Sequence, residues 1–163
     1  MAATLRANAL IEPVVSVLML TRNHGAFLQQ AIDSVIAQTL FHRCELLIGE
    51  DGSSDHTAAV AWAAALAHPG RIWVFESPAG SLGFHRNFER LSCAARAPFV
   101  AFLEGDDWWS DPRKLECQVE LLQQQPHLAF CGGRTRIWDS SHALHHAETR
   151  EIGPADGCSQ LAF

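Results

Sequence analysis

VAFLEGDDWWSDPRKL, residues 100–115, is the stretch that decides the fold. An apolar run that predicts a buried strand stops at Glu104, and Gly105, Asp106 and Asp107 follow it directly. Three carboxylates within four residues repel one another and lose hydration at a strand end. A fold tolerates this when a cation such as a divalent metal lies among them. The stretch therefore predicts a strand whose carboxyl end carries a cation site.

Strands and helices alternate around this stretch. Apolar runs rich in β-branched residues predict buried strands at residues 14–20, 44–49, 72–75 and 99–103. Apolar residues at helical spacing predict helices from residue 28, over 57–67, over about 84–95 and after residue 115. Two further short strands are expected at residues 127–133 and 134–138. This order favours an α/β sheet with mostly parallel strands and right-handed crossovers.

Two helix starts carry capping signals. Ser53 or Ser54 is the expected N-cap of the helix over 57–67, with Asp55 in its first turn. Asp111 and Pro112 are expected as the N-cap and the first position of the helix that follows the acidic stretch.

The composition restricts the class of protein. The 163 residues make one domain or most of one, and 48% apolar with 18% charged residues indicates a globular chain. The net charge of −6, without a basic stripe, argues against nucleic-acid binding. Five widely spaced cysteines without a CxxC pair favour reduced thiols in a cytosolic protein. No apolar run approaches the roughly 18 residues that cross a membrane, so a cytoplasmic location is expected. Peripheral contact with the inner face of a membrane stays open.

Polar clusters follow three of the predicted strands: TRNHG, EDGSSD and EGDDWW. The carboxyl ends of parallel strands meet at one sheet edge, where ligands bind. Any single cluster is also explained as a solvated turn, but three of them at one edge weaken that alternative. One cleft is therefore expected to receive Thr21, Arg22, Asn23, Glu50, Asp51, Glu104, Asp106 and Asp107.

The common nucleotide fingerprints are absent from the sequence. Neither GxxxxGK[ST] nor GxGxxG after the first strand occurs, so phosphate binding would depend on a divalent ion. Paired aspartates suit Mg²⁺ or Mn²⁺, which keep open positions for diphosphate oxygens. Such an ion stabilises the charge on a leaving diphosphate, which favours group transfer.

Five segments together resemble glycosyltransferase family 2, the nucleotide-diphospho-sugar transferases with the GT-A fold. The segments are VVSVLMLTRN, AIDSVIAQTL, CELLIGEDGSSDHT, GFHRNFERL and FVAFLEGDDWWSDPRKLECQVELL, and the match as a whole runs from about residue 14 to about residue 132. The resemblance implies a Rossmann-like three-layer α/β/α sandwich with a mostly parallel sheet, incomplete at its C-terminus. It also implies inverting transfer of a sugar, with Mn²⁺ or Mg²⁺, from a UDP- or dTDP-sugar to a glycan or lipid-linked acceptor. Such enzymes act in polysaccharide and cell-envelope biosynthesis.

The resemblance assigns roles to single residues. It implies that the nucleoside is held by Thr21, Arg22, Asn23, Glu50 and Asp51. Arg86 matches a position near the donor phosphates, Asp106 and Asp107 match the acidic metal motif, and Glu104 stands where many members have Asp. Arg22 replaces a frequent aromatic residue and Glu50 a frequent Asp, which leaves the base open. One of Trp108 and Trp109 is expected to form an apolar wall for a sugar, and the other to cover the sheet edge.

The general base that an inverting transferase needs is not identifiable. Asp139, Glu148, Glu151 and Asp156 are available, but nothing singles one out. The alternative function is therefore a catalytically weak or inactive sugar-nucleotide-binding fragment or regulatory module. Nucleotidyl transfer would need a Gly-rich basic loop after the first strand, and a phospho-acceptor receiver domain a lysine after its last strand; neither is present.

The expected organisation has three parts. Residues 1–13 are a lead-in, residues 14–138 the nucleotide-sugar-binding domain, and residues 139–163 an irregular tail. HALHH at residues 142–146 has spacing compatible with a zinc site, but it is interpreted as part of the solvated tail.

Overall fold

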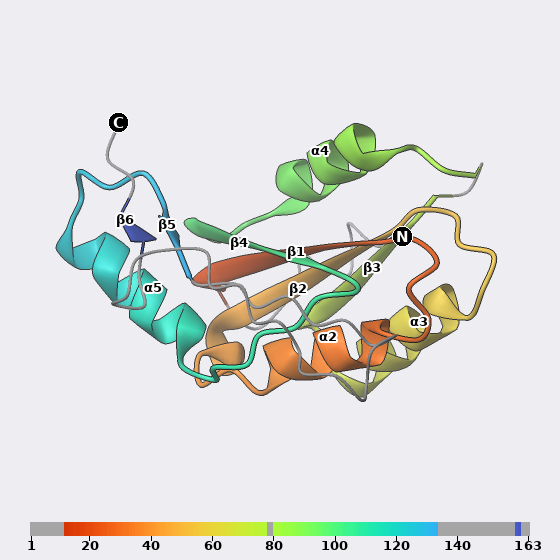
Figure 1. Cartoon of the computed structure of the whole chain (residues 1–163), viewed down its shortest axis with the longest axis horizontal. Coiled ribbons are helices and arrows are strands. Elements are labelled where there is room, and N and C mark those ends of the chain that lie inside the picture. The colour runs from red at the N-terminus through yellow and green to blue at the C-terminus, as the bar shows by residue number, and fades with distance from the viewer. Residues whose placement is uncertain (1–11, 78–79, 134–158, 161–163) are drawn as a thin grey trace, which may run out of the picture. The chain divides into compact units, whose positions relative to one another are not determined.

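A computed structural model describes residues 12–77, 80–133 and 159–160 (Figure 1). The chain divides into two compact units, residues 1–115 and 116–163, which are described separately. The first unit contains, in order, β1 (Val15–Thr21), α2 (Leu28–Ile36), a 3-10 helix (Phe41–Arg43), β2 (Cys44–Glu50), α3 (Thr57–Ala67), β3 (Ile72–Glu76), α4 (Phe84–Ala94) and β4 (Phe99–Glu104).

The four strands of the first unit form one parallel sheet in the order β3-β2-β1-β4. The predicted parallel α/β sheet is confirmed. Each strand ends one residue later than predicted, at Thr21, Glu50, Glu76 and Glu104. Parallel pairing continues into the polar clusters, because Thr21 is the register partner of Glu50. The first polar residue of each cluster is therefore part of the rigid sheet.

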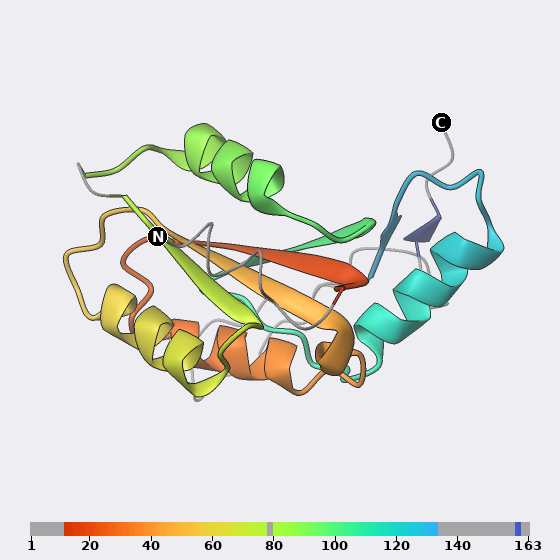
Figure 2. The same ribbon diagram turned by 180° about the vertical axis from the view of Figure 1, so that it is seen from behind.

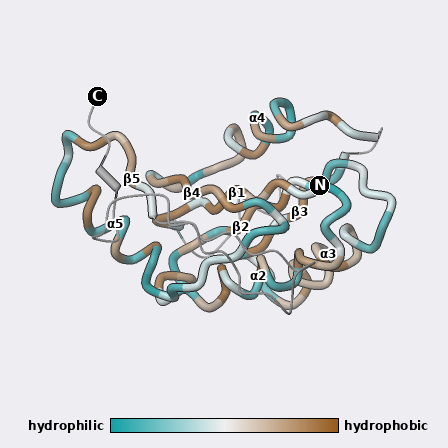
Figure 3. The backbone as a smooth tube through the Cα atoms, viewed as in Figure 1, coloured by the Kyte–Doolittle hydropathy of each residue, from teal (hydrophilic) through white to brown (hydrophobic). Residues whose placement is uncertain are grey.

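Helices cover both faces of the sheet in three layers. α2 and α3 lie on one face and α4 lies on the other (Figures 1 and 2). α2 buries Leu28, Ala31, Ile32 and Val35, the same face that the sequence predicts. The central strands β1 and β2 are buried along their whole length, and Figure 3 shows the apolar residues concentrated on the strands. Burying each Leu or Ile side chain contributes roughly 1.5–3 kcal/mol, so these two strands form the core.

β4 differs from the other strands because one of its faces is exposed. Val100 is 47% and Phe102 is 54% exposed, whereas the next residue, Leu103, is buried. β4 is the outer strand next to β1, so only β1 is hydrogen-bonded to it within the sheet. The continuous apolar run of residues 99–103 predicts a strand that is buried on both faces. Within the described residues, other elements cover only one face of β4.

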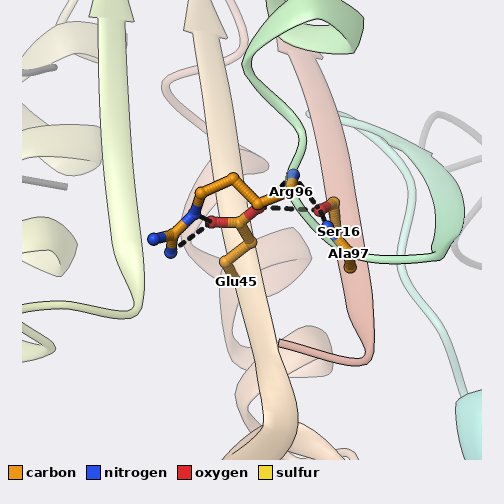
Figure 4. A network of polar contacts seen from close by, with 4 residues as sticks. All are labelled: Ser16, Glu45, Arg96 and Ala97. Carbon is orange, nitrogen blue, oxygen red and sulfur yellow. Dashed lines mark hydrogen bonds and ion pairs between the residues drawn. The ribbon is translucent and has the colours of Figure 1, made fainter. Parts of the chain in front are cut away.

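A buried carboxylate ties the amino ends of β1 and β2 to the segment before β4 (Figure 4). Glu45 is 1% exposed and accepts hydrogen bonds from Ser16 Oγ at 2.7 Å and from the Arg96 main-chain amide at 2.9 Å. The Arg96 guanidinium adds contacts of 3.0 Å from Nε and 2.8 Å from Nη2 to Glu45 Oε2. This network lies at the sheet end opposite the polar clusters and satisfies an otherwise unpaired buried charge.

The cap predicted for α3 is wrong, whereas the contact expected of the Asp111 cap is present. α3 has His56 at its N-cap position and no side-chain cap, while Asp55 Oδ1 accepts from the Thr57 amide at 2.9 Å. Ser53 and Ser54 are instead bonded to the loop after β1, which removes them from the helix start. Asp111 precedes α5 (Lys114–Gln124), and its Oδ1 accepts from the Arg113 amide at 2.8 Å, which is the side-chain contact of an N-cap.

The second unit contains most of α5 and a two-stranded antiparallel sheet of β5 (Cys131–Gly132) and β6 (Ser159–Gln160). The strand predicted at residues 127–133 is thus shorter than expected, and the strand predicted at residues 134–138 lies outside the described residues. Leu115 and Val119 are buried along α5, as its apolar spacing predicts. Within the described segments, no helix has the length and apolarity to cross a membrane.

Candidate functional site

The three polar loops start side by side at the carboxyl edge of the sheet. β1 lies between β2 and β4, with Thr21 opposite Glu50 and Leu20 opposite Glu104. The hydrogen bonds continue past the strand ends: the Asp51 amide donates to the Thr21 carbonyl at 3.0 Å, and the Gly105 amide donates to the Leu20 carbonyl at 2.8 Å. The predicted convergence of the three clusters at one edge is confirmed.

The loop after β1 is held by the loop after β2. Asn23 has a positive φ of 56°, and its Oδ1 accepts from the Ser54 amide at 2.8 Å. Its own amide donates to Ser53 Oγ at 3.0 Å. Asn tolerates this left-handed conformation better than most residues because its short amide bonds locally. The side chain of Asn23 thus joins two loops, while Arg22 beside it is exposed.

Glu50 is a buried strand-end carboxylate whose oxygens are occupied by its own loop. It is 3% exposed, and it accepts from the Ser53 amide at 2.6 Å and from the Gly52 amide at 3.2 Å. These contacts fix the turn that leads into α3. Its carboxylate therefore organises backbone at the sheet edge.

Asp51 joins the sheet edge to the segment before α4. It is 5% exposed and accepts from Ser81 Oγ at 2.6 Å, from the Leu82 amide at 2.6 Å and from the Gly83 amide at 3.0 Å. Burial opposes ionisation of this carboxyl, but the three hydrogen bonds and the charge of Arg90 outweigh it and lower its pKa below the ordinary value.

The segment before α4 packs closely on the loop after β2. A Cβ on Gly52, whose φ is 70°, would lie 2.9 Å from the Gly80 carbonyl carbon. Glycine is required at residue 52 both by this approach and by the backbone conformation.

Arg90 is the cation that the structure brings to the acidic end of β2. Its Nη2 donates to the Glu50 carbonyl at 2.8 Å and its Nη1 to the Glu76 carbonyl at 3.0 Å. Arg86, one helical turn earlier on α4, is exposed. Asn87 between them is 3% exposed and donates to the Gly49 carbonyl at 2.9 Å. Arg90 lies four residues after Arg86, on the same side of α4, and this helical spacing is the sequence signal that could have identified Arg90.

The acidic turn after β4 is compact and carries two neighbouring charges. The Asp107 amide donates to the Glu104 carbonyl at 3.2 Å, and Glu104, Asp106 and Asp107 are all exposed. Partial desolvation and the negative charge of Asp106 raise the pKa of Asp107 above its ordinary value, and His24 acts in the opposite direction. The direction of this pKa shift agrees with the repulsion and loss of hydration that the sequence predicts for the carboxylates of this turn.

The turn also lies against two buried polar atoms of the β1 loop. Thr21 Oγ1 and His24 Nδ1 are buried without a hydrogen-bond partner. A Cβ on Gly105 would come within 2.5 Å of Thr21 Oγ1 and 3.0 Å of His24 Nδ1. Only glycine fits between the turn and the end of β1.

This donor set fits a hard divalent cation that keeps open positions. Across the described residues, no group of three His, Cys, Asp or Glu side chains forms a complete metal site. Two adjacent carboxylates, Asp106 and Asp107, supply oxygen ligands of the kind that Mg²⁺ and Mn²⁺ prefer. An ion held by two such ligands retains positions for oxygens of a bound substrate.

The two tryptophans after the acidic turn have different surroundings. Trp108 is 40% exposed. Trp109 is half-buried, its amide donates to Ser34 Oγ at 3.1 Å, and Lys114 Nζ lies 4.5 Å from the centre of its ring. Trp109 is thus fixed on α2, and Trp108 presents an apolar surface beside the carboxylates.

An apolar cavity of about 310 Å³ lies between α4 and the sheet. It is lined by Leu18, Leu20, Phe84, Phe88, Phe102, Leu103 and Glu104. The rings of Phe88 and Phe102 are 5.0 Å apart between centroids, and Phe84 stacks on Phe88 at 6.3 Å. Glu104 is the only charged residue of the lining, so the cavity ends at the acidic turn.

Comparison of the sequence with protein families finds one matching family over most of the chain. Residues 16–160 match the family described as Glycosyl transferase family 2. Curated relatives include an uncharacterized glycosyltransferase of Nostoc sp., 36% identical over 135 residues, which are 78% of this chain and 40% of the relative. An uncharacterized protein of Mycobacterium tuberculosis is 30% identical over 123 residues, which are 76% of this chain and 35% of the relative.

Solved structures share the fold at low sequence identity. A mannosyltransferase from Pyrobaculum calidifontis, solved in complex with GDP-Man and Mn²⁺, has a TM-score of 0.65 and 19% identity over 80% of this chain and 37% of that chain. S. aureus TarS in complex with UDP-GlcNAc has a TM-score of 0.62 and 18% identity over 69% of this chain and 32% of that chain.

The family match covers most of this chain, whereas the chain covers only part of each relative. The chain spans 35–40% of the two curated relatives named above. The structural similarity confirms the expected GT-A architecture with helices on both faces of a parallel sheet. With the family match covering residues 16–160, the chain belongs to glycosyltransferase family 2.

Proposed function

We propose that this chain is the donor-binding part of a metal-dependent, inverting glycosyltransferase. The observation that carries the proposal is the position of Asp106 and Asp107, which follow the end of β4 after Gly105 and lie in the turn next to the end of β1. Partial desolvation and the charge of Asp106 raise the pKa of Asp107, and a dication bound between the two carboxylates would offset both effects. Asp106 and Asp107 would hold Mn²⁺ or Mg²⁺.

The nucleoside half of the donor is proposed to bind at the loops after β1 and β2. The planar guanidinium of exposed Arg22 would stack on the base. Thr21, Asn23, Glu50 and Asp51 would shape the floor, because their hydrogen bonds fix the two loops against each other. Preorganised loops lower the entropic cost of binding.

The diphosphate is proposed to lie between the acidic turn and α4. A cation on Asp106 and Asp107 supplies Lewis-acid stabilisation of the leaving diphosphate. Arg86 on α4 is exposed and offers five N–H donors to phosphate oxygens. Exposed Glu104 would accept from a sugar hydroxyl, and Trp108 would cover one face of the sugar. The solved neighbours with GDP-Man and Mn²⁺ and with UDP-GlcNAc support a nucleoside diphosphate sugar as the ligand class. UDP- and dTDP-sugars are the donors we propose for this chain.

The acceptor would approach from the side of Glu104, as a glycan or a lipid-linked sugar. The apolar cavity that ends at Glu104 supports the lipid-linked type, because its lining is made of leucine and phenylalanine. The four carboxylates considered as general base, Asp139, Glu148, Glu151 and Asp156, lie outside the described residues.

A second candidate function is sugar-nucleotide binding without turnover. It is favoured by the use of Glu50 and Asp51 as hydrogen-bond acceptors for the chain's own loops. With Asp106 and Asp107 assigned to the metal, Glu104 is the remaining carboxylate of the acidic turn. Binding and turnover must therefore be measured separately.

A donor panel read by thermal shift tests the function. UDP-, dTDP- and GDP-sugars are added to the full chain with Mn²⁺ or with EDTA, and release of nucleoside diphosphate is measured in parallel. A rise in Tm with one donor class, present with Mn²⁺ and absent with EDTA, is expected. Release of nucleoside diphosphate in the presence of an acceptor supports the transferase, and binding without release supports the binding module. No shift with any donor contradicts both.

A further inference from the structure

His24 is anchored at the start of α2 and faces the acidic turn. Its carbonyl accepts from the amides of Phe27 at 2.9 Å and Leu28 at 2.8 Å, so its backbone is held at the first turn of the helix. Its ring lies against Gly105, where an added Cβ would be 3.0 Å from Nδ1. The position of the imidazole is therefore set both by the helix start and by the turn that carries Asp106.

The inner ring nitrogen of His24 has no hydrogen-bond partner although it is buried. Nδ1 lies 3.7 Å from Asp106 Oδ1, which is too long for a hydrogen bond. The His24 side chain is 24% exposed, and that of Asp106 is 47% exposed. Buried polar atoms are almost always paired, so an unpaired nitrogen beside a half-exposed carboxylate points to a contact that forms in another state of the site.

We propose that His24 is a positioning residue for Asp106, and that its Nδ1–H donates to the Asp106 carboxylate when the acidic turn holds its divalent cation. The inference rests on the proposed function. A shift of about 1 Å in the Asp106 side chain closes the gap to ordinary hydrogen-bond length. The bond would orient one carboxylate oxygen and leave the other for the cation. Hydrogen bonds of this kind fix the ligands of metal sites and typically change metal affinity by roughly 10–100-fold.

The surrounding contacts favour this role over simple packing. The Gly105 amide is bonded to the Leu20 carbonyl, so the turn cannot move away from β1 and Asp106 stays within reach. His24 Nδ1 lies 3.7 Å from Asp106 Oδ1, and the ring also opposes the rise in the pKa of neighbouring Asp107. A ring that served only for packing would not need a nitrogen directed to this turn.

Direct titration of the full chain with Mn²⁺, followed by electron paramagnetic resonance of the free ion, tests the proposal. His24→Ala is expected to weaken Mn²⁺ binding roughly 10–100-fold. His24→Asn keeps a donor close to the position of Nδ1 and is expected to stay within about threefold of the unsubstituted chain. His24→Gln places its amide near the position of Nε2 and is expected to bind as weakly as the alanine variant.

His42→Asn is the matched control. His42 is exposed, and its Nδ1 lies 3.1 Å from the Thr39 carbonyl before β2, at the opposite end of the sheet. Its substitution is expected to leave Mn²⁺ affinity unchanged. Urea unfolding of each variant separates loss of fold from loss of affinity, and if His24→Ala does not fold, the comparison of the Asn and Gln variants decides.

The outcomes separate this inference from the proposed function. Equal Mn²⁺ affinity of His24→Ala and the unsubstituted chain, or equal weakening by Asn and Gln, overturns the role of His24 while the metal site stands. Absence of Mn²⁺ binding in the unsubstituted chain overturns the metal site itself, and the inference with it.

Discussion

The carboxylate of Asp51 accepts a hydrogen bond of 2.6 Å from the main-chain amide of Leu82. This contact joins the end of β2 to the residues just before α4, 31 positions later in the chain. Gly83, the N-cap residue of α4, donates to the same carboxylate at 3.0 Å. Asp51 thus determines where α4 begins, and with it the positions of Arg86 and Arg90.

Asp51→Asn is expected to destabilise the fold. The amide keeps one acceptor, but its NH₂ group faces a main-chain N–H, so a buried donor loses its partner at a cost of roughly 1–3 kcal/mol. The free energy of unfolding in urea measures the loss. Asp33→Asn is the control, because the exposed Asp33 side chain accepts only from Gln29 of the same helix in the described contacts. An equal change in both variants contradicts the role of Asp51.

The lowered pKa of Asp51 predicts a pH dependence of stability. A carboxyl whose folded pKa lies below its unfolded value of about 3.9 stabilises the fold above that pH, and the contribution is lost as the pH falls through the folded pKa. The difference in unfolding free energy between the unsubstituted chain and Asp51→Asn is therefore expected to be constant above about pH 5 and to shrink below about pH 4. A difference that grows on acidification would contradict this assignment.

The buried pair of Glu45 and Arg96 is expected to be sensitive to the loss of one partner. Arg96→Met leaves Glu45, which is 1% exposed, without its guanidinium contacts. The expected loss is about 3 kcal/mol, at the lower end for a buried pair because the Arg96 side chain is 33% exposed. Replacing both residues, Glu45→Gln with Arg96→Met, should recover part of the loss. Chemical denaturation of the two variants measures it, and no recovery would indicate that Ser16 and the amides matter more than the ion pair.

The alternation of strands and helices could be predicted from the sequence. Every residue of β1 and β2 is buried, so these strands have nearly continuous apolar runs that are recognisable in the sequence. The polar edge followed from the positions of Thr21, Glu50 and Glu104 at the ends of such runs. The start of α3 could not be predicted correctly, because Ser53 and Ser54 bond to Asn23, a partner 30 and 31 residues away. Arg90 and His24 were missed for the same reason: their significance depends on which carbonyl or carboxylate the fold places beside them.

Gly105→Ala tests the close approach of the acidic turn to β1. The new Cβ would lie 2.5 Å from Thr21 Oγ1, so the turn must shift and carry Asp106 and Asp107 with it. Mn²⁺ affinity is expected to fall at least tenfold while the sheet remains folded. Gly132→Ala is the control, since a Cβ there meets no atom within 4 Å. Unchanged Mn²⁺ affinity in Gly105→Ala, measured by the same titration, would show that the geometry of the turn is not critical.

The central claim is that the two aspartates after β4 bind a dication that in turn holds the donor diphosphate. Isothermal titration of the unsubstituted chain and of Asp107→Asn with UDP, dTDP and their sugars, each with Mn²⁺ and with EDTA, tests it most directly. We expect Mn²⁺-dependent binding that Asp107→Asn abolishes, with a Tm equal to or slightly above that of the unsubstituted chain, because a like-charge repulsion is removed. Equal donor affinity in Asp107→Asn with Mn²⁺ present would contradict the claim.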